Sequence, residues 1–470
     1  MAFGKKVKKI KKSFTDVMSQ LAEAQSFSTA SNPRIDVPFI DLWLNGALTL
    51  GKQISIIGPP NHGKSTLTYV LIGRLLRTCV ECNTMAYDFT DGKTHKYKCR
   101  CGKNSFMNVI LVDNEMRADK PYLQILGVPF HGEVKAFKHT NFMMKWGPHD
   151  PKKSGKLVIM NSVNAEATYG FVADELKHGQ FHAVAIDALN SLPNEKRAEE
   201  HKVQPGDLAK MHTEGLKNLL NARVQCYISH GFIPTVIWTN HMTMAFGPTM
   251  FQPKAIESGG FSPGHYADQR VELTSARKND EAITKLTKQP EHLIVRTTRF
   301  IIPKSTTGMF EGVKGDFQLF YAHHQAGAGE HYVPGDNYEH MKMFSIMSKL
   351  GLMKKVKAGW EIFGLPPFRV QDDIKVWLKD PVNQLEAKYW LGVLAATDVS
   401  LAYLDSKDYL YNPFLDKARI KKYLGEIHEL RNVGQQVGKP KSKEPVKKAG
   451  SKKRGKTKPA EETLADLLDD

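Results

Sequence analysis

Short apolar runs alternate with longer segments of helical periodicity between about residue 36 and residue 320. The runs that predict strands cover residues 53–57, 108–113, 182–187, 234–240, 271–273, 293–298 and 316–321. Strands that alternate with helices form mainly parallel sheets covered by those helices. We therefore expect an α/β core over residues 31–334.

The two ends of the chain have different patterns. Residues 1–30 contain an apolar stripe at helical spacing, formed by Phe14, Val17, Met18 and Leu21. This stripe predicts a helix that docks either on its own domain or on a neighbouring subunit. Residues 335–430 are mostly of helical character with a turn and strand at 359–363, which predicts a small α+β C-terminal domain.

Residues 431–470 form a tail of biased composition. It is rich in Lys, Gly, Pro and Ser and then turns acidic from Ala460 to Asp470. Such a composition is typical of disorder. The acidic tip either competes with a polyanion for basic surfaces, docks on a partner protein through its leucines, or only solubilises the chain.

The loop after the first strand carries a phosphate-binding motif. Its residues follow G-x-x-x-x-G-K-[ST] and lead into a helical run that starts at Thr66: Gly58, Pro59, Pro60, Asn61, His62, Gly63, Lys64 and Ser65. Such a loop holds phosphates with backbone amides and a helix N-terminus, its Lys binds the outer phosphates, and its Ser hydroxyl ligates Mg²⁺. The motif predicts binding of ATP with Mg²⁺.

Two other predicted strands end in acidic residues. One ends in Asp113-Asn114-Glu115 and the other in Asp187. Carboxylates at the C-terminal ends of parallel strands line the same crevice as a phosphate loop. Asp187 is the candidate for the Mg²⁺ shell, and Glu115 is the candidate for orienting the attacking water. The alternative for each is a helix-capping or turn acid.

The charge balance narrows the choice of partner. The 470 residues carry 66 basic and 49 acidic side chains, a net charge of +17, which suits a polyanion such as nucleic acid or else reflects two basic tails on a neutral body. No apolar run is long enough to span a bilayer. The basic N-terminal stretch lacks the apolar core of a secretory signal, so we expect a cytoplasmic protein without a membrane partner.

Four of the five cysteines lie close together in the sequence. Cys79, Cys82, Cys99 and Cys101 form the pattern C-x2-C-x16-C-x-C, with a hairpin signal at Asp91-Gly92 between the pairs. Four thiolates at such spacing bind Zn²⁺ tetrahedrally. The pattern predicts a zinc ribbon inserted in the core at 79–101; the alternatives are free thiols or a partial site with His95. Its basic residues make DNA contact a further option.

The order of these features resembles the RecA/RadA recombinases, and most closely the RecA-like recombinases of bacteriophages, over about residues 36–380. The segments that carry the resemblance are Phe39–Ala47 with Leu50–Lys52, the Asp-x-Glu strand end, Ile186–Leu192, Ile237–Met242, Glu257–Gly260, Tyr266–Leu273, and Leu350–Trp360. The resemblance implies a RecA-like P-loop ATPase that begins with an entry strand at 39–47.

The resemblance also implies roles for individual residues. Glu115 corresponds to the catalytic glutamate and His241 to the γ-phosphate sensor, where bacterial members usually carry Gln. Arg299, or less well Arg296, corresponds to the strand that reaches the ATP of the adjacent subunit. The DNA-binding loops would be 195–206 and 242–258, with these contact residues: Lys196, Arg197, Lys202, Phe246, Met250, Phe251, Lys254, Gly259 and Gly260.

The resemblance thus implies an ATP-dependent recombinase that assembles as a helical filament on single-stranded DNA and pairs it with double-stranded DNA. It would work in the cytoplasm of a phage-infected bacterium, where a partner that docks on the tail would be a protein of replication or recombination. Two alternatives share the core. A RecA-like hexameric helicase would form a closed ring. A single-strand-binding scaffold would lack catalysis, which Lys64, Ser65, Glu115 and Asp187 argue against.

Overall fold

The computed structural model describes residues 35–44, 48–90, 95–99, 101–129, 135–138, 142–146, 150–193, 206–245, 254–257, 262–275, 295–306, 311–320, 324–325, 331–332 and parts of 335–391. The chain divides into two compact units, Met1–Leu415 and Asp416–Asp470. Every described residue belongs to the first unit. The expected N-terminal helix, the first DNA loop up to residue 205 and the tail lie outside the described residues.

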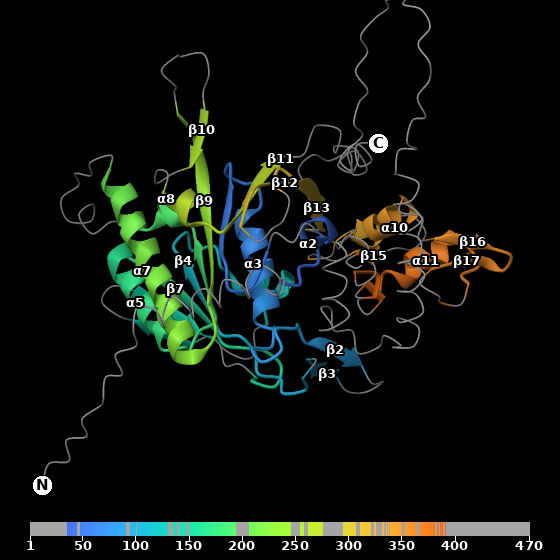
Figure 1. Ribbon diagram of the computed structural model, residues 1–470, viewed down its shortest axis with the longest axis horizontal. Coiled ribbons are helices and arrows are strands. Elements are labelled where there is room, and N and C mark those ends of the chain that lie inside the picture. Colours follow the sequence, from blue (N-terminus) through green and yellow to red (C-terminus); the bar gives the residue numbers. More distant parts are fainter. Residues whose placement is uncertain are drawn as a thin grey trace, which may run out of the picture. The chain divides into compact units, whose positions relative to one another are not determined.

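One large mixed sheet of eleven strands organises the described residues (Figure 1). Its centre is parallel and consists, in spatial order, of β11 (Gln269–Ser275), β1 (Gln53–Gly58), β9 (Thr235–Ala245), β8 (Ala183–Asp187), β4 (Val109–Asp113) and β7 (Leu157–Ser162). The expectation of an α/β core with a mainly parallel centre is confirmed.

Antiparallel strands extend both edges of this sheet. β12 (Val295–Ser305) and β13 (Lys314–Phe320) follow β11, while β6 (Phe142–Trp146) and β5 (Lys135–Lys138) follow β7. β10 (Lys254–Glu257) pairs only with the far end of β9, as an antiparallel hairpin that rises above the sheet in Figure 1.

The central strands are buried on both faces, which explains why they are continuous apolar runs. Every residue of β1, β4 and β8 is buried, as expected of parallel strands covered by helices. The covering helices include α3 (Lys64–Leu75), α5 (Ala165–Lys177) and α7 (Asp207–His230). α5 starts where the Asn164 side chain accepts a hydrogen bond from the Ala167 amide, and α7 ends at Gly231, whose φ is 78°.

The remaining described elements of the core are short. They comprise α2 (Ile40–Leu44), α4 (Lys120–Ile125), the 3-10 helix η1 (Leu189–Ser191), α8 (Ser262–Tyr266), and the small ribbons β2 (Tyr87–Thr90) with β3 (His95–Lys98) and β14 (His324–Gln325) with β15 (His331–Tyr332). The β2–β3 ribbon is the hairpin expected between the cysteine pairs. None of the helices among these residues is long and apolar enough to cross a membrane.

Three expectations need correction. The segment 39–47 was expected to contain an entry strand, but Ile40–Leu44 form helix α2. Strands β5, β6 and β7 were not predicted. The second DNA loop was expected over 242–258, but residues 242–245 continue β9 and Lys254 lies in β10, so only the tip between them remains for a loop, and that tip lies outside the described residues.

A small α+β segment follows the sheet in sequence, as expected. It contains α10 (Glu339–Lys349), the antiparallel pair β16 (Lys354–Val356) and β17 (Gly359–Glu361), and α11 (Gln371–Trp377). It is joined to the start of the core by buried polar contacts. The Ile40 amide donates to Glu339 Oε2 at 2.6 Å, and Lys388 Nζ lies 3.0 Å from Asp36 Oδ1.

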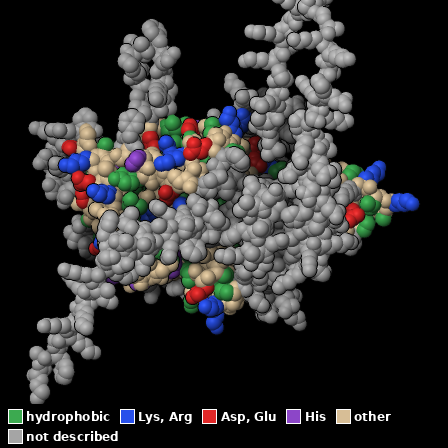
Figure 2. Space-filling model, viewed as in Figure 1, with side chains coloured by type: hydrophobic (Ala, Val, Ile, Leu, Met, Phe, Trp, Pro, Cys, Tyr) green, Lys and Arg blue, Asp and Glu red, His purple; other side chains and the backbone are tan. Residues whose placement is uncertain are grey.

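Charges on the surface are mixed where they are described. On the face shown in Figure 2, basic and acidic side chains of the described residues are interspersed. The net charge of +17 belongs to the whole chain, so this face does not by itself explain it.

Candidate nucleotide-binding site

Register brings the candidate residues to one edge of the parallel sheet. Gly58 at the end of β1 pairs with His241 on β9, and Asp113 at the end of β4 pairs with Asp187 at the end of β8. Gly58, Asp113 and Asp187 are the last residues of their strands, and His241 lies beside Gly58 on β9, which runs between β1 and β8 and continues to Ala245. This edge is where ligands bind in open α/β sheets.

The two glycines of the phosphate loop are required by its backbone. A Cβ on Gly58 would lie 2.5 Å from the Leu273 carbonyl oxygen of β11, which is too close for any side chain. Gly63 has a φ of 80° and precedes the first residue of α3, a conformation that favours glycine. The loop therefore leads sharply from β1 into α3, with the helix N-terminus facing the pocket.

Lys64 is held at the base of this loop. Its side chain is nearly buried, with 6% of the residue exposed, and Nζ donates to the carbonyl oxygens of Gly58 at 3.0 Å and Pro59 at 2.7 Å. Burial lowers its pKa to about 8, although the carboxylates of Asp187 and Glu115 act in the opposite direction. A bound phosphate would add negative charge beside Lys64 and favour its charged form.

Asp187 is buried and its two carboxylate oxygens are oriented by hydroxyl groups. Thr239 on β9 donates to Oδ1 at 2.6 Å, and Tyr69 on α3 donates to Oδ2 at 3.0 Å. A carboxylate has about four acceptor sites, so capacity remains toward the pocket. Burial, together with the neighbouring Asp187, raises the pKa of Tyr69, so its hydroxyl stays a donor.

Glu115 sits in a turn after β4 and contacts two side chains. Its Oε1 lies 3.2 Å from His241 Nε2, and its Oε2 lies 3.0 Å from an Arg117 guanidinium nitrogen. The turn is stabilised by Asp113, whose carboxylate accepts hydrogen bonds from the amides of Arg117 and Ala118 at 3.1 and 2.8 Å. Burial raises the pKa of Asp113, which these amides partly offset.

These residues line one pocket. Its lining comprises Asn61, His62, Gly63, Lys64, Ser65, Thr66, Tyr69, Glu115, Arg117, Tyr122, Asp187, Ala188, Thr239 and His241. The structure thus brings together the predicted phosphate loop, both predicted acids and the predicted sensor. Oxygen donors from Ser65 and Asp187 share the pocket, which is the ligand type that Mg²⁺ prefers.

Other predicted residues lie elsewhere. Arg299 is in β12, paired with Asp316 of β13, and is not part of the described lining. Its neighbour Thr298 is the strand residue that faces the phosphate loop, with Oγ1 3.4 Å from where a Gly63 Cβ would stand. The other predicted DNA contacts lie outside the described residues, apart from Lys254, of which only the strand backbone is described.

Sequence reasoning missed five lining residues. Tyr69, Thr239, Arg117 and Tyr122 all contact predicted residues, and Ala188 follows Asp187. Thr66 shares a 2.7 Å hydrogen bond with Tyr122. The i, i+4 helical spacing from Ser65 to Tyr69 and the strand position of Thr239 two residues before His241 are signals that could have found those two. Arg117 and Tyr122 had no such signal.

A buried polar network connects the sensor strand to the hairpin beyond it. Asn240, next to His241, donates to Glu257 Oε1 at 3.0 Å, and Arg270 of β11 donates to Glu257 Oε2 at 2.9 Å. Burial raises the pKa of Glu257, opposed by Asn240 and Arg270. The end of β10 is therefore tied to the residue that precedes the candidate sensor.

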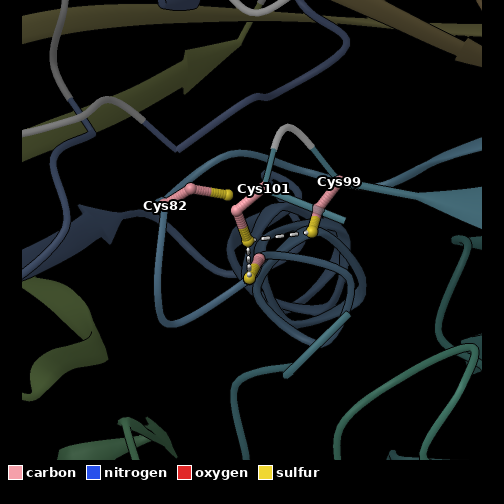
Figure 3. A group of neighbouring side chains, drawn as sticks. Cys82, Cys99 and Cys101 are labelled. Carbon is pink, nitrogen blue, oxygen red and sulfur yellow. Dashed lines mark hydrogen bonds between the residues drawn. The ribbon is translucent and has the colours of Figure 1, made fainter. Parts of the chain in front are cut away.

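The four clustered cysteines form a second candidate site. One ligand atom from each of Cys79, Cys82, Cys99 and Cys101 lies within 4.8 Å of the others, so this cluster can hold a metal ion such as zinc. Figure 3 shows the thiols of the labelled cysteines turned toward a common centre. Cys79 and Cys99 are buried, and Cys101 is exposed.

Comparison with protein-family models and with curated proteins finds no match for this chain.

Proposed function

We propose that this protein is an ATP-dependent DNA recombinase that forms filaments on single-stranded DNA and promotes homologous pairing and strand exchange. The observation that carries the ATPase part is the single pocket in which Lys64, Ser65, Glu115, Asp187 and His241 meet. The recombinase part rests on the resemblance of the segments around these residues to the RecA-like family.

In this proposal the phosphates of ATP lie on the loop amides at the start of α3, with Lys64 on the outer phosphates. The Lys64 ammonium group would then bind both the phosphates and the carbonyl oxygens of Gly58 and Pro59. Ser65 and Asp187 would hold Mg²⁺, which would neutralise part of the phosphate charge. Thr239 and Tyr69 keep the Asp187 carboxylate oriented for this task.

In this proposal Glu115 orients the attacking water, and its two present partners link it to the nucleotide. The Arg117 guanidinium and the His241 ring each contact one of its carboxylate oxygens. Both partners also line the pocket, so a γ-phosphate competes with Glu115 for them. Exchange of these partners onto phosphate frees the carboxylate to accept a hydrogen bond from water.

The DNA-binding part of the proposal uses the hairpin. Because His241 lies on β9 and the hairpin β9–β10 continues directly from it, a shift of the sensor on phosphate binding reaches the predicted second DNA segment through a continuous strand. Lys254, Phe246, Phe251 and Met250 supply charge for the DNA backbone and apolar surface for bases.

The test combines turnover with imaging. We expect ATP hydrolysis that single-stranded DNA stimulates, and open helical filaments on that DNA with a slowly hydrolysed ATP analogue. Lys64→Ala removes the lysine proposed to bind the outer phosphates and should abolish hydrolysis, so it serves as the negative control. A closed ring would favour the helicase alternative, and assembly without hydrolysis would favour the non-catalytic scaffold.

A further inference from the structure

Among the described residues, the insertion that carries the cysteines has only a small buried apolar cluster. Its buried cluster consists of Cys79, Ala86, Cys99 and Phe106, with Cys82 packed against it. Small units with so little apolar surface need disulfides or a metal for stability. None of the five cysteines forms a disulfide.

The geometry of the sulfurs fits a tetrahedral thiolate site. Zn–S bonds of about 2.3 Å place the sulfurs of such a site about 3.8 Å apart. The Cys101 sulfur lies 3.6 Å from that of Cys79 and 3.5 Å from that of Cys99, and all four ligand atoms lie within 4.8 Å of one another. All four sulfurs therefore reach one ion with small adjustments.

Backbone amides face the sulfurs, as a site for anionic thiolates requires. The Asn104 amide lies 3.4 Å from the Cys99 sulfur. Amides of Glu81 and Cys82 hydrogen bond with Cys79, that of Thr84 with Cys82, and that of Lys103 with Cys101. Charge-assisted bonds of this kind stabilise a thiolate over a thiol.

Two turns present these amides. In the first, the Asn83 amide donates to the Cys79 carbonyl at 2.8 Å, and Asn83 has a φ of 55°. In the second, the Gly102 amide donates to the Cys99 carbonyl at 3.1 Å, and Gly102 has a φ of 72°. Each cysteine pair thus lies in a tight turn whose backbone amides lie near the sulfurs.

The site lies where the phosphate-loop helix ends and the strand to Glu115 begins. Thr78, whose amide closes the end of α3 on the Leu75 carbonyl, directly precedes Cys79. Five residues after Cys101, Phe106 and Met107 lead into β4. Two hydrogen bonds join these segments: Met107 N to Thr78 O at 3.0 Å and Val80 N to Ser105 O at 2.8 Å.

We propose that one Zn²⁺ ion bound by Cys79, Cys82, Cys99 and Cys101 clamps the end of α3 to the segment that leads into β4. Lys64 begins α3 and Glu115 follows β4, so the clamp fixes the far ends of the two elements that carry them. The consequence for the nucleotide pocket rests on the proposed function; the metal site and the clamp do not.

Metal content of the full chain tests the site. Protein purified under reducing conditions should contain about one zinc ion per chain. Cys82→Ser with Cys101→Ser replaces the two less buried ligands and should lose that zinc, and Co²⁺ loaded into the unmodified chain should show the absorption of tetrahedral thiolate coordination. Lys103→Ala, which removes only the neighbouring ion pair with Glu81, should keep the metal. Fresh reduced protein without zinc, or a double variant that retains it, would overturn the site.

Hydrogen exchange tests the clamp without using activity or a variant. When a chelator removes zinc from the unmodified chain, the Val80 and Met107 amides, which join the two segments, should lose their protection from exchange. The Val236 amide, bonded to Lys52 O across the sheet, should stay protected as an internal control. Unchanged exchange at Val80 and Met107 after the metal has left would overturn the clamp.

Affinity for a fluorescent ATP analogue tests the link to the pocket. The zinc-free chain should bind it more weakly than the zinc-loaded chain, and equal affinity would overturn the link. If neither form binds nucleotide while zinc content and exchange behave as expected, the proposed function fails and the clamp stands.

Discussion

At the scale of single residues, the candidate catalytic glutamate has partners that the sequence did not reveal. Glu115 and His241 were each predicted, but their 3.2 Å contact and the ion pair with Arg117 were not. The position of Arg117 depends on the positive φ of Met116 and on the two amides that Asp113 holds. Such a turn has no sequence signature, whereas a phosphate loop has one because its backbone requires glycines at fixed spacing.

Replacement of Glu115 by Gln tests its role. Gln keeps the size of the side chain and an acceptor oxygen but not the charge that orients water, so ATP hydrolysis should fall by at least about 100-fold. ATP binding and assembly on DNA should be largely unchanged. Steady-state hydrolysis and analogue binding are the measurements, with Glu214→Gln on the exposed side of α7 as the control. Undiminished hydrolysis would remove Glu115 from the catalytic role.

At the scale of elements, the central strands were predictable because both their faces are buried. Continuous apolar runs marked β1, β4, β8 and β9, and β7 carries the same signal in Leu157–Met160, so it could have been found. The outer strands β5 and β6 have short mixed sequences, Lys-Ala-Phe-Lys and Phe-Met-Met-Lys-Trp. Pairing with a neighbour stabilises such strands more than their own pattern does.

The resemblance predicted a separate segment at 242–258 but gave it the wrong structure, because its described residues form the β9–β10 hairpin. Residues 242–245 and 254–257 were expected in a loop, and they pair as strands. The pairing is supported at its foot by Glu257, whose partners come from β9 and β11. Contacts among three strands depend on the assembled sheet, which local sequence patterns do not specify.

The Glu257 network should contribute to stability. Arg270→Met would leave the Glu257 carboxylate buried without its cation, and we expect the free energy of unfolding to fall by about 2 kcal/mol. Adding Glu257→Gln to Arg270→Met should recover part of this loss, because the amide needs no cation and still accepts from Asn240. Urea unfolding of both single variants and the double variant measures the coupling. Strictly additive effects would show that the pair does not interact.

At the scale of the whole molecule, the start of the described core and the C-terminal segment are joined by buried charges. Glu339 accepts from the Ile40 amide across 299 positions of sequence, and Lys388 meets Asp36 across 352. Lys342 contacts both Asp41 and Asp316. The sequence predicted both segments but not their contact, because no periodicity relates residues so far apart. The predicted tail and DNA loops stay predictions.

We expect Glu339 to make the stability of this junction depend on pH. Burial raises its pKa to about 7, although Lys342 and Lys388 and the Ile40 amide lower it; Asp41 adds to the rise. A carboxyl whose pKa is raised by folding favours the folded state when protonated. Its stabilisation is therefore complete below about pH 4.5, the ordinary value for Glu, and is lost as pH rises through about 7.

Glu339→Gln isolates this effect because Gln is neutral at every pH and keeps an oxygen for the Ile40 amide. Relative to the unmodified chain, the variant should gain stability as pH rises from about 4.5 to above 7, by up to about 3 kcal/mol. Urea unfolding of both proteins across this range measures the difference between their free energies of unfolding. The contributions of the other titrating groups are the same in both proteins and cancel in this difference. Glu214→Gln, at an exposed position, should show no such trend. A difference between Glu339→Gln and the unmodified chain that is constant with pH would mean that Glu339 is already ionised in the fold, with Lys342 and Lys388 compensating its burial.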